Sequence, residues 1–161
     1  MENIANNINE LEKSLLPWLG RTLKGLDFFL TDAFRQKDID LTKAQLILLR
    51  RLAVRDGLAQ HNLAFITDRD KASLTRLIST MERKALVVRK ASRSDKRVNH
   101  VFITAKGLET LRLAMPVVLE AIASAQHGIC LDDLVTTISV LEKIRQNINT
   151  DDHWYPESAR E

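Results

Sequence analysis

The sequence predicts a mainly α-helical protein that carries one small β-hairpin, and three observations support this fold class. Gly and Pro are scarce, with five and three residues among 161, so the chain has few helix breaks. Apolar residues recur at spacings of three and four over most of the chain. The stretch 86–103 instead holds two runs rich in β-branched residues on either side of a polar loop, which is typical of a hairpin.

A long first helix is predicted from about Pro17 to Gln36, because proline is tolerated in a first turn, where its missing N–H has no partner to lose. Two neighbouring stripes cover roughly half of its circumference, so we expect this helix to contact two partners. The first stripe holds Leu19, Leu23, Leu26, Leu30 and Ala33. The second holds Trp18, Thr22, Gly25 and Phe29.

Two shorter helices are predicted next. Thr42 and Gln45 have the spacing of a capping box, which predicts a helix from 43 to about 55, ended by Gly57. A short helix is expected over Ala59–Ile66. The inward residues of the first of these helices are expected to be Leu46, Leu49, Leu52 and Ala53.

Asp70 has the chemistry of an N-cap and predicts an amphipathic helix that runs to about Lys84. The face opposite its apolar side has short, hydroxylated and cationic side chains and carries no acid. The apolar side consists of Leu74, Leu77, Ile78 and Met81.

The hairpin and two more helices complete the chain. Leu86–Lys90 and Val98–Ile103 flank a basic loop without the Asn-Gly of a tight turn, so the loop should be long. Thr104 is expected to cap the next helix. The last two helices carry apolar seams that a monomer could not hide, which predicts an intertwined two-fold dimer. These seams are Leu108, Leu111, Met115, Val118, Ile122 and Ala125, then Leu131, Leu134, Ile138, Leu141 and Ile148.

Positive charge is concentrated in one part of the chain. Residues 69–97 hold ten of the 24 Lys and Arg residues and only three acids, so this stretch carries +7 although the whole chain carries +3. A basic run alone is often just a solvated surface, but this one coincides with the amphipathic helix and the hairpin. A three-helix unit followed by a basic hairpin is the arrangement of a winged helix-turn-helix, whose helix fits the major groove of DNA and whose hairpin can enter the minor groove.

This reading gives two sets of candidate DNA-contacting residues. The set on the recognition helix is Lys71, Ala72, Ser73, Thr75, Arg76, Ser79 and Arg83. The set on the wing is Arg89, Lys90, Arg93, Asp95, Lys96 and Arg97. Arg97 is expected to reach a minor groove with Asp95 orienting its guanidinium, whereas Arg89 and Lys90 are expected to contact phosphates.

Several segments between Leu41 and Gly107 match a known pattern in order and spacing. They are Leu41-Thr42 with Gln45; Gln60, Leu63 and Ala64; Asp70-Lys71; Leu74-Thr75-Arg76-Leu77; Glu82-Arg83-Lys84-Ala85-Leu86-Val87; Asp95-Lys96-Arg97; and Ile103-Thr104-Ala105-Lys106-Gly107. Together they resemble the multiple antibiotic resistance regulator (MarR) family of transcription factors. The resemblance implies a dimeric repressor that binds a pseudo-palindromic operator and is released by a small, often phenolic, ligand.

Several residues depart from the family pattern, among them Thr67 and Asp68, which stand where an apolar residue and a glycine are usual before the recognition helix. Ala85 stands where glycine is common, so the end of the recognition helix must either avoid positive φ or tolerate strain. Ala72 stands where serine is common, which favours contact with a thymine methyl group over a polar contact.

The elements divide the chain into four predicted regions: 1–39, N-terminal dimerisation helices; 40–104, the winged helix-turn-helix lobe; 105–149, C-terminal dimerisation helices; and 150–161, a polar tail. Trp18, Thr22 and Phe29 could border an effector pocket, although Gly25 between them could instead allow close helix packing. The alternative function is a helical dimer that senses a ligand or protein partner without useful DNA binding; it would have a neutral groove face or a wing without Arg.

Other classes of protein are disfavoured. The four histidines lack metal-ligand spacing, and no nucleophile elbow or phosphate loop is present, so we expect no enzyme, metal or cofactor. Cys130 lacks a second cysteine for a disulfide, which fits a reducing cytoplasm, and it lies beside two acids that disfavour a thiolate. With no apolar run of spanning length, the protein is expected in the cytoplasm, associated with the nucleoid and not with a membrane.

Overall fold

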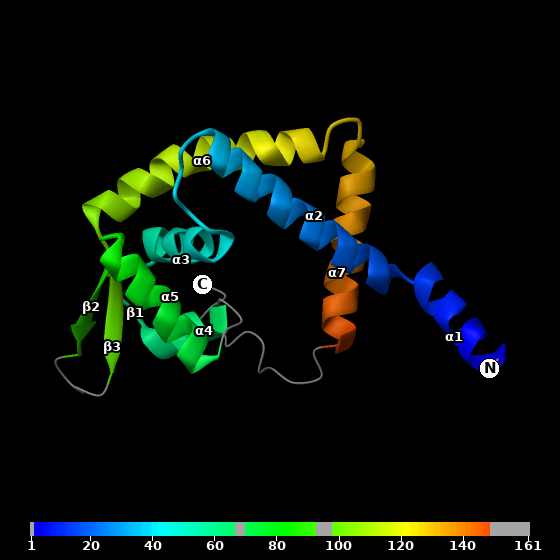
Figure 1. Ribbon diagram of the computed structural model, residues 1–161, viewed down its shortest axis with the longest axis horizontal. Helices are drawn as coiled ribbons and strands as arrows, with labels where there is room; N and C mark the ends of the chain where they lie inside the picture. Colours follow the sequence, from blue (N-terminus) through cyan, green and yellow to red (C-terminus); the bar gives the residue numbers. More distant parts are fainter. Residues whose placement is uncertain (1, 67–69, 93–97, 149–161) are drawn as a thin grey trace.

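The computed structural model describes residues 2–66, 70–92 and 98–148, and over these residues it shows a mainly helical fold with one three-stranded antiparallel sheet (Figure 1). The predicted fold class is therefore confirmed. The elements are α1 (Glu2–Lys13), α2 (Leu15–Gln36), α3 (Lys43–Val54), β1 (Leu58–Ala59), α4 (Gln60–Ile66), α5 (Lys71–Arg83), β2 (Val87–Ala91), β3 (Asn99–Ile103), α6 (Ala105–Ala125) and α7 (Leu131–Ile148).

The three predicted N-caps form as their side-chain chemistry requires. Thr42 and Gln45 make both bonds of the capping box, at 3.3 Å from Gln45 N to Thr42 Oγ1 and 3.1 Å from Thr42 N to Gln45 Oε1. Asp70 Oδ1 accepts from the backbone N–H of Ser73 at 2.8 Å. Thr104 Oγ1 accepts from the N–H of Gly107 at 3.0 Å. Each cap satisfies a backbone donor that has no partner within its helix.

The core lies where α3, α4, α5, the sheet and α6 meet, with Phe34 at the end of α2 packed into it. Leu48 is fully buried and Ala53 is exposed, so the prediction that Ala53 points inward was wrong. The reason is that α3 packs against α2, α5, β3 and α6 together, which buries a wider arc than one stripe and includes Leu48. The apolar face predicted for α5 is confirmed at Leu74, Ile78 and Met81.

Strand β1 was not predicted. Leu58 pairs with Val101 and Ala59 pairs with His100, so the sheet has the order β1-β3-β2, whereas the sequence pattern placed Ala59 in a helix. Two residues are too short to show a strand periodicity, and only their distant partner makes them a strand. Helix α3 also ends at Val54, three residues before Gly57, which has a φ of +69° in the connection to β1.

The end of the recognition helix has left-handed geometry. Ala85 has a φ of +57°, so of the two alternatives the chain tolerates the strain. The N–H of Leu86 donates to Met81 O at 2.9 Å, and that of Ala85 donates to Glu82 O at 2.8 Å, which are the two bonds of a Schellman motif. This motif turns the chain sharply from α5 into the wing.

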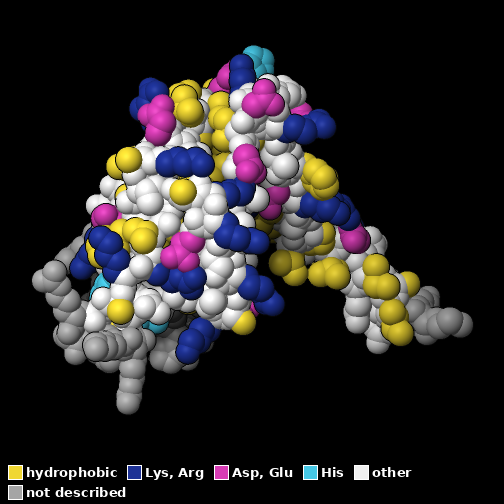
Figure 2. Space-filling view, turned by 60° about the vertical axis from the view of Figure 1, so that its left-hand side comes forward, with side chains coloured by type: hydrophobic (Ala, Val, Ile, Leu, Met, Phe, Trp, Pro, Cys, Tyr) yellow, Lys and Arg dark blue, Asp and Glu magenta, His cyan; other side chains and the backbone are white. Residues whose placement is uncertain are grey.

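Outside the helix-turn-helix lobe, α2 and α6 lie side by side, and α7 and α1 project from them (Figure 1). No residue of α7 is buried, and α1 presents an apolar row of Ile4, Ile8 and Leu11 to solvent. Figure 2 shows this row as hydrophobic side chains along the projecting arm. In the described part of the chain, none of the helices has the length and hydropathy needed to cross a membrane.

Candidate nucleic-acid interface

Helix α5 is anchored on one side and exposed on the other. Leu74, Ile78 and Met81 fix it in the core, so the opposite face has a defined direction. On that face Lys71, Ala72, Arg76 and Arg83 are exposed, and Ser73, Thr75 and Ser79 are half-buried. Asp70 lies at the N-cap, where the hydrogen bond from the N–H of Ser73 lowers the pKa of its carboxyl, so this acid stays ionised just before the helix. Within α5 itself, none of the exposed residues is an acid.

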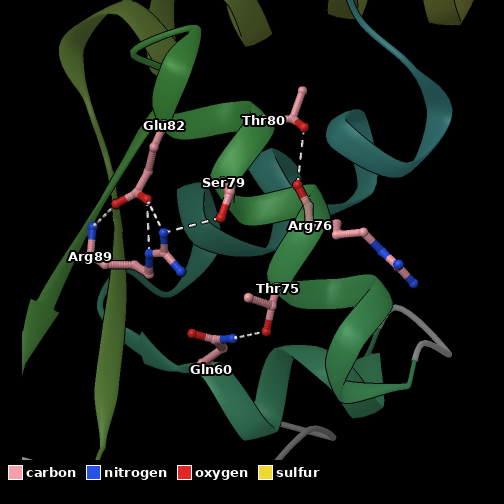
Figure 3. Close-up of polar contacts among 7 residues, drawn as sticks. All are labelled: Gln60, Thr75, Arg76, Ser79, Thr80, Glu82 and Arg89. Atoms are coloured by element: carbon pink, nitrogen blue, oxygen red, sulfur yellow. Dashed lines mark hydrogen bonds and ion pairs between the residues drawn. The ribbon is translucent and has the colours of Figure 1, made fainter.

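Thr75 is held from two sides. Its hydroxyl donates to Lys71 O at 2.7 Å and accepts from Gln60 Nε2 at 2.9 Å, which ties α5 to the start of α4 (Figure 3). Gln60 was recognised only as part of the family pattern and not as a site residue. Its side chain fixes the position of the recognition helix, and no local sequence signal indicates that partnership.

Arg89 joins the wing to the recognition helix. Its backbone N–H donates to Glu82 Oε1 at 2.9 Å, its Nε donates to Glu82 Oε2 at 2.8 Å, and its Nη2 donates to Ser79 Oγ at 3.2 Å. Figure 3 shows Glu82 and Ser79 on the side of α5 that faces Arg89. The structure therefore places the candidate residue Arg89 in an internal ion pair, with side chains only 28% and 27% exposed for Arg89 and Glu82.

The charge of Glu82 is stabilised by this contact. Burial alone would raise the pKa of its carboxyl, but the hydrogen bonds from the Arg89 side chain and backbone outweigh burial and lower the pKa. Sequence periodicity placed Glu82 near the apolar side of the helix and gave it no role. Its partner lies across the turn into β2, which helical spacing does not reveal.

Arg76 points away from Arg89, on the other side of the helix (Figure 3). It lines an open hollow of about 810 Å³ together with Asp27, Lys43 and Thr80. Lys43 is paired with Asp27 at 2.5 Å, so the hollow has one salt bridge on its wall. Thr80 donates to Arg76 O at 3.0 Å and accepts from Arg83 Nη2 at 3.2 Å.

On the wing, Lys90 is exposed and its Nζ lies 4.9 Å from the centre of the Phe102 ring, which is a cation–π contact. Strands β2 and β3 pair from Val87↔Ile103 to Ala91↔Asn99, which confirms the hairpin. The remaining wing candidates, Arg93, Asp95, Lys96 and Arg97, lie outside the described residues.

The effector candidates lie on the exposed surface of α2. Trp18 is 58% exposed and Phe29 is 45% exposed, and Thr22 is exposed between them. Arg21 lies 5.7 Å from the centre of the Trp18 ring, and Phe29 lines a small hollow of about 140 Å³ against α6. Cys130 is exposed, and no cluster of three potential metal ligands occurs among the residues described.

A helix-turn-helix with a cationic second helix, followed directly by an antiparallel hairpin, defines a winged helix-turn-helix fold. Residues 39–98 match the model of the MarR family.

Individual relatives extend the comparison over most of the chain. The Bacillus subtilis protein YybA, named as an uncharacterized HTH-type transcriptional regulator, is 26% identical over 137 residues, which cover 85% of this chain and 90% of that protein. A SlyA-like transcription regulator from Listeria monocytogenes has a TM-score of 0.75 at 26% identity and covers 89% of this chain and 93% of its own.

A third relative is described as the transcriptional repressor CouR bound to a 23-mer DNA duplex; it has a TM-score of 0.78 at 24% identity and covers 84% of this chain and 95% of its own. At this identity the likeness is one of fold. All three proteins are named as transcription regulators and not as enzymes.

Proposed function

We propose that the protein is a dimeric repressor that binds a pseudo-palindromic DNA operator, with α5 in the major groove and the β2–β3 wing in the adjacent minor groove. The observation that carries this proposal is the exposed face of α5, where Lys71, Arg76 and Arg83 lie without an acid among them. Cations on a rigidly anchored helix neutralise phosphates and release counterions, and the short side chains between them let the helix approach base edges.

The fold supports repression as the mode of action. CouR, which shares the fold, is described as a repressor bound to a DNA duplex. A regulator of this kind acts by occupying its operator, so DNA binding by the helix and wing is sufficient for its activity. The proposed DNA contacts include the exposed Arg76 and Arg83 of α5, Lys90 of the wing, and the wing-tip residues Arg93, Lys96 and Arg97.

We also propose that a second copy of the chain covers the exposed apolar surfaces of α1 and α7. Helix α7 buries none of its residues in the single chain, although Leu131, Val135 and Ile138 are all more than half exposed. A two-fold dimer would bury these residues. Binding a pseudo-palindromic operator requires the two copies of α5 in such a dimer to lie about one DNA turn apart, roughly 34–36 Å.

Release by a small aromatic ligand is the last part of this proposal. Trp18, Thr22 and Phe29 are exposed in the single chain, so they could enclose a ligand only if the second copy covers them. The hollow beside Arg76 offers a second location, because an anionic ligand that reached Lys43 and Arg76 would compete with DNA for a groove-face cation. The two locations are distinguished by whether Trp18→Ala or Lys43→Ala abolishes release.

The alternative is a helical dimer that senses a ligand or a protein partner without useful DNA binding. It requires a neutral groove face, whereas the face of α5 carries three exposed cations. A genomic-fragment binding selection with the purified full chain tests both functions. Enrichment of a pseudo-palindromic sequence by the wild type, but not by an Arg76→Ala/Arg83→Ala double variant, is expected; no enrichment by the wild type would favour the alternative.

A further inference from the structure

The hydroxyl groups on α5 differ in the hydrogen bonds that remain open to them. Thr75 and Thr80 each donate their proton to a backbone oxygen one turn earlier, Lys71 O and Arg76 O respectively. Each also accepts from a side chain, Gln60 Nε2 for Thr75 and Arg83 Nη2 for Thr80. Because a hydroxyl has a single proton, neither threonine can donate to DNA without breaking a bond it already makes.

Ser79 is in a different state. Its oxygen accepts from Arg89 Nη2 at 3.2 Å, and its proton has no acceptor among the described residues. It is half-buried and lies one turn from Arg76 and one turn from Arg83, both exposed on the groove face. The serine therefore presents a free donor to whatever α5 contacts.

The direction of this hydrogen bond is set by Glu82. Its carboxylate accepts from both the backbone and the guanidinium of Arg89, so Arg89 is fixed beside the helix with its Nη2 directed at Ser79. Both side chains of this ion pair are largely shielded from solvent, which makes the pair stiffer than an exposed one. As long as the pair holds, one lone pair of Ser79 is occupied and its proton remains available to an acceptor on a bound molecule.

We propose that Ser79 is a specificity-determining residue that donates to a hydrogen-bond acceptor on a base edge and selects against cytosine. In the major groove guanine, adenine and thymine each offer an acceptor, whereas cytosine offers only an amine donor. Arg89 is a positioning residue in this scheme, because it acts through Ser79. The inference rests on the proposed insertion of α5 into the major groove.

The test is a selection from random duplexes with the full-length wild type and four variants, read as base preference at each position. The wild type is expected to disfavour cytosine at one position of each half-site, roughly threefold to tenfold, the value of one hydrogen bond. Ser79→Ala should accept all four bases there, whereas Ser79→Thr, which keeps the hydroxyl, should retain the exclusion.

Two further variants separate this role from a general effect on the fold. Thr110→Val removes a hydroxyl on α6 that donates to Lys106 O at 2.8 Å and belongs to none of the proposed DNA contacts, so its selected motif should equal that of the wild type. Arg89→Met frees the oxygen of Ser79 to accept from a cytosine amine and should relax the same single position. A change at that position in Thr110→Val would show that a general effect of removing a hydroxyl, and not the Ser79 proton, sets the preference.

The outcomes separate the two proposals. If the wild type selects a motif and Ser79→Ala selects the same one, the role of Ser79 is wrong while DNA recognition by α5 stands. The same conclusion follows if Ser79→Thr loses the exclusion, and this variant decides the matter even if Ser79→Ala unfolds. If the wild type selects no motif, the proposed function itself fails and the role of Ser79 fails with it.

Discussion

Gly107, in the first turn of α6, lies so close to Leu86 at the start of the wing that a Cβ on Gly107 would approach Leu86 O to 2.2 Å. The same carbonyl accepts from Thr104 N and Thr104 Oγ1, both at 3.1 Å, so it is held in place. The atom in the way is the backbone oxygen of Leu86, which cannot move aside by side-chain rotation. Leu86 is also buried, so this contact joins α6 to the recognition helix and wing.

We therefore expect Gly107→Ala to lower the free energy of unfolding by about 1–3 kcal/mol, the usual range for overpacking. Gly20→Ala is the matched control, because nothing lies within 4 Å of a Cβ at that position. The control should be neutral or stabilising by about 0.5–1 kcal/mol through helix propensity. Urea unfolding followed by circular dichroism measures both, and a Gly107→Ala variant as stable as the wild type would contradict the close approach.

Ala85→Gly should stabilise the protein. The left-handed φ of +57° costs an L-residue about 1–2 kcal/mol, and glycine avoids this cost while adding about 0.4–1 kcal/mol of unfolded-state entropy. The expected net gain is about 0.5–1 kcal/mol. Ala53→Gly on the exposed surface of α3 is the control and should destabilise by a similar amount. If Ala85→Gly lowered the free energy of unfolding as much as Ala53→Gly does, Ala85 would be unstrained.

The Glu82–Arg89 pair predicts a pH dependence of stability. The folded state holds the pKa of the Glu82 carboxyl below its usual value. At a pH between the folded and the unfolded pKa of this group, the folded protein therefore binds fewer protons than the unfolded chain. The contribution of the pair is present above the unfolded pKa and is lost as the pH falls through the folded pKa. The wild type should therefore exceed Glu82→Gln in stability most clearly at about pH 6, and the difference should shrink toward about pH 3.

Glu109→Gln is the control for this titration. Glu109 pairs with Arg112 on the solvent-facing side of α6, with side chains 53% and 70% exposed, and screening by water makes such a pair weak. The thermal unfolding of the wild type and both variants, measured across the pH series, tests the comparison. A Glu82→Gln curve parallel to that of the wild type at every pH would remove the role assigned to the ion pair.

Dimerisation is expected to depend on one face of α7. Ile138 is 57% exposed in the single chain and lies in the apolar row of this helix. Ile138→Asp would place a charge in the proposed interface, so its mass by light scattering should shift toward the monomer at micromolar concentration. Thr136→Asp, on the opposite side of the same helix, should remain dimeric. A monomeric wild type would refute the assembly.

Arg76→Ala should weaken binding to the selected operator by about 1–3 kcal/mol and relax discrimination at the bases it contacts. Arg112→Ala, which removes an exposed cation on α6, should leave the affinity unchanged. Fluorescence anisotropy on operator and random duplexes measures both. If Arg76→Ala weakens the two duplexes equally, Arg76 contacts a phosphate and reads no base.

The sequence by itself determined the features that depend on near neighbours in the chain. The N-caps at Thr42, Asp70 and Thr104 follow from side chains that reach backbone donors three residues later, and this geometry needs no tertiary partner. The same holds for the two faces of α5, because a period of 3.6 residues separates Leu74 and Ile78 from the groove face wherever the helix packs.

Only the tertiary structure decided which distant groups meet. Strand β1 exists because β3 pairs with it, and Leu48 is buried while Ala53 is exposed because α3 packs against four elements at once. The sequence pattern also treated Thr75 and Ser79 alike, as two hydroxyls on one face. Their difference comes from Gln60 on α4 and Arg89 on β2, and hydrogen bonds between separate elements depend on how the elements pack and not on local spacing.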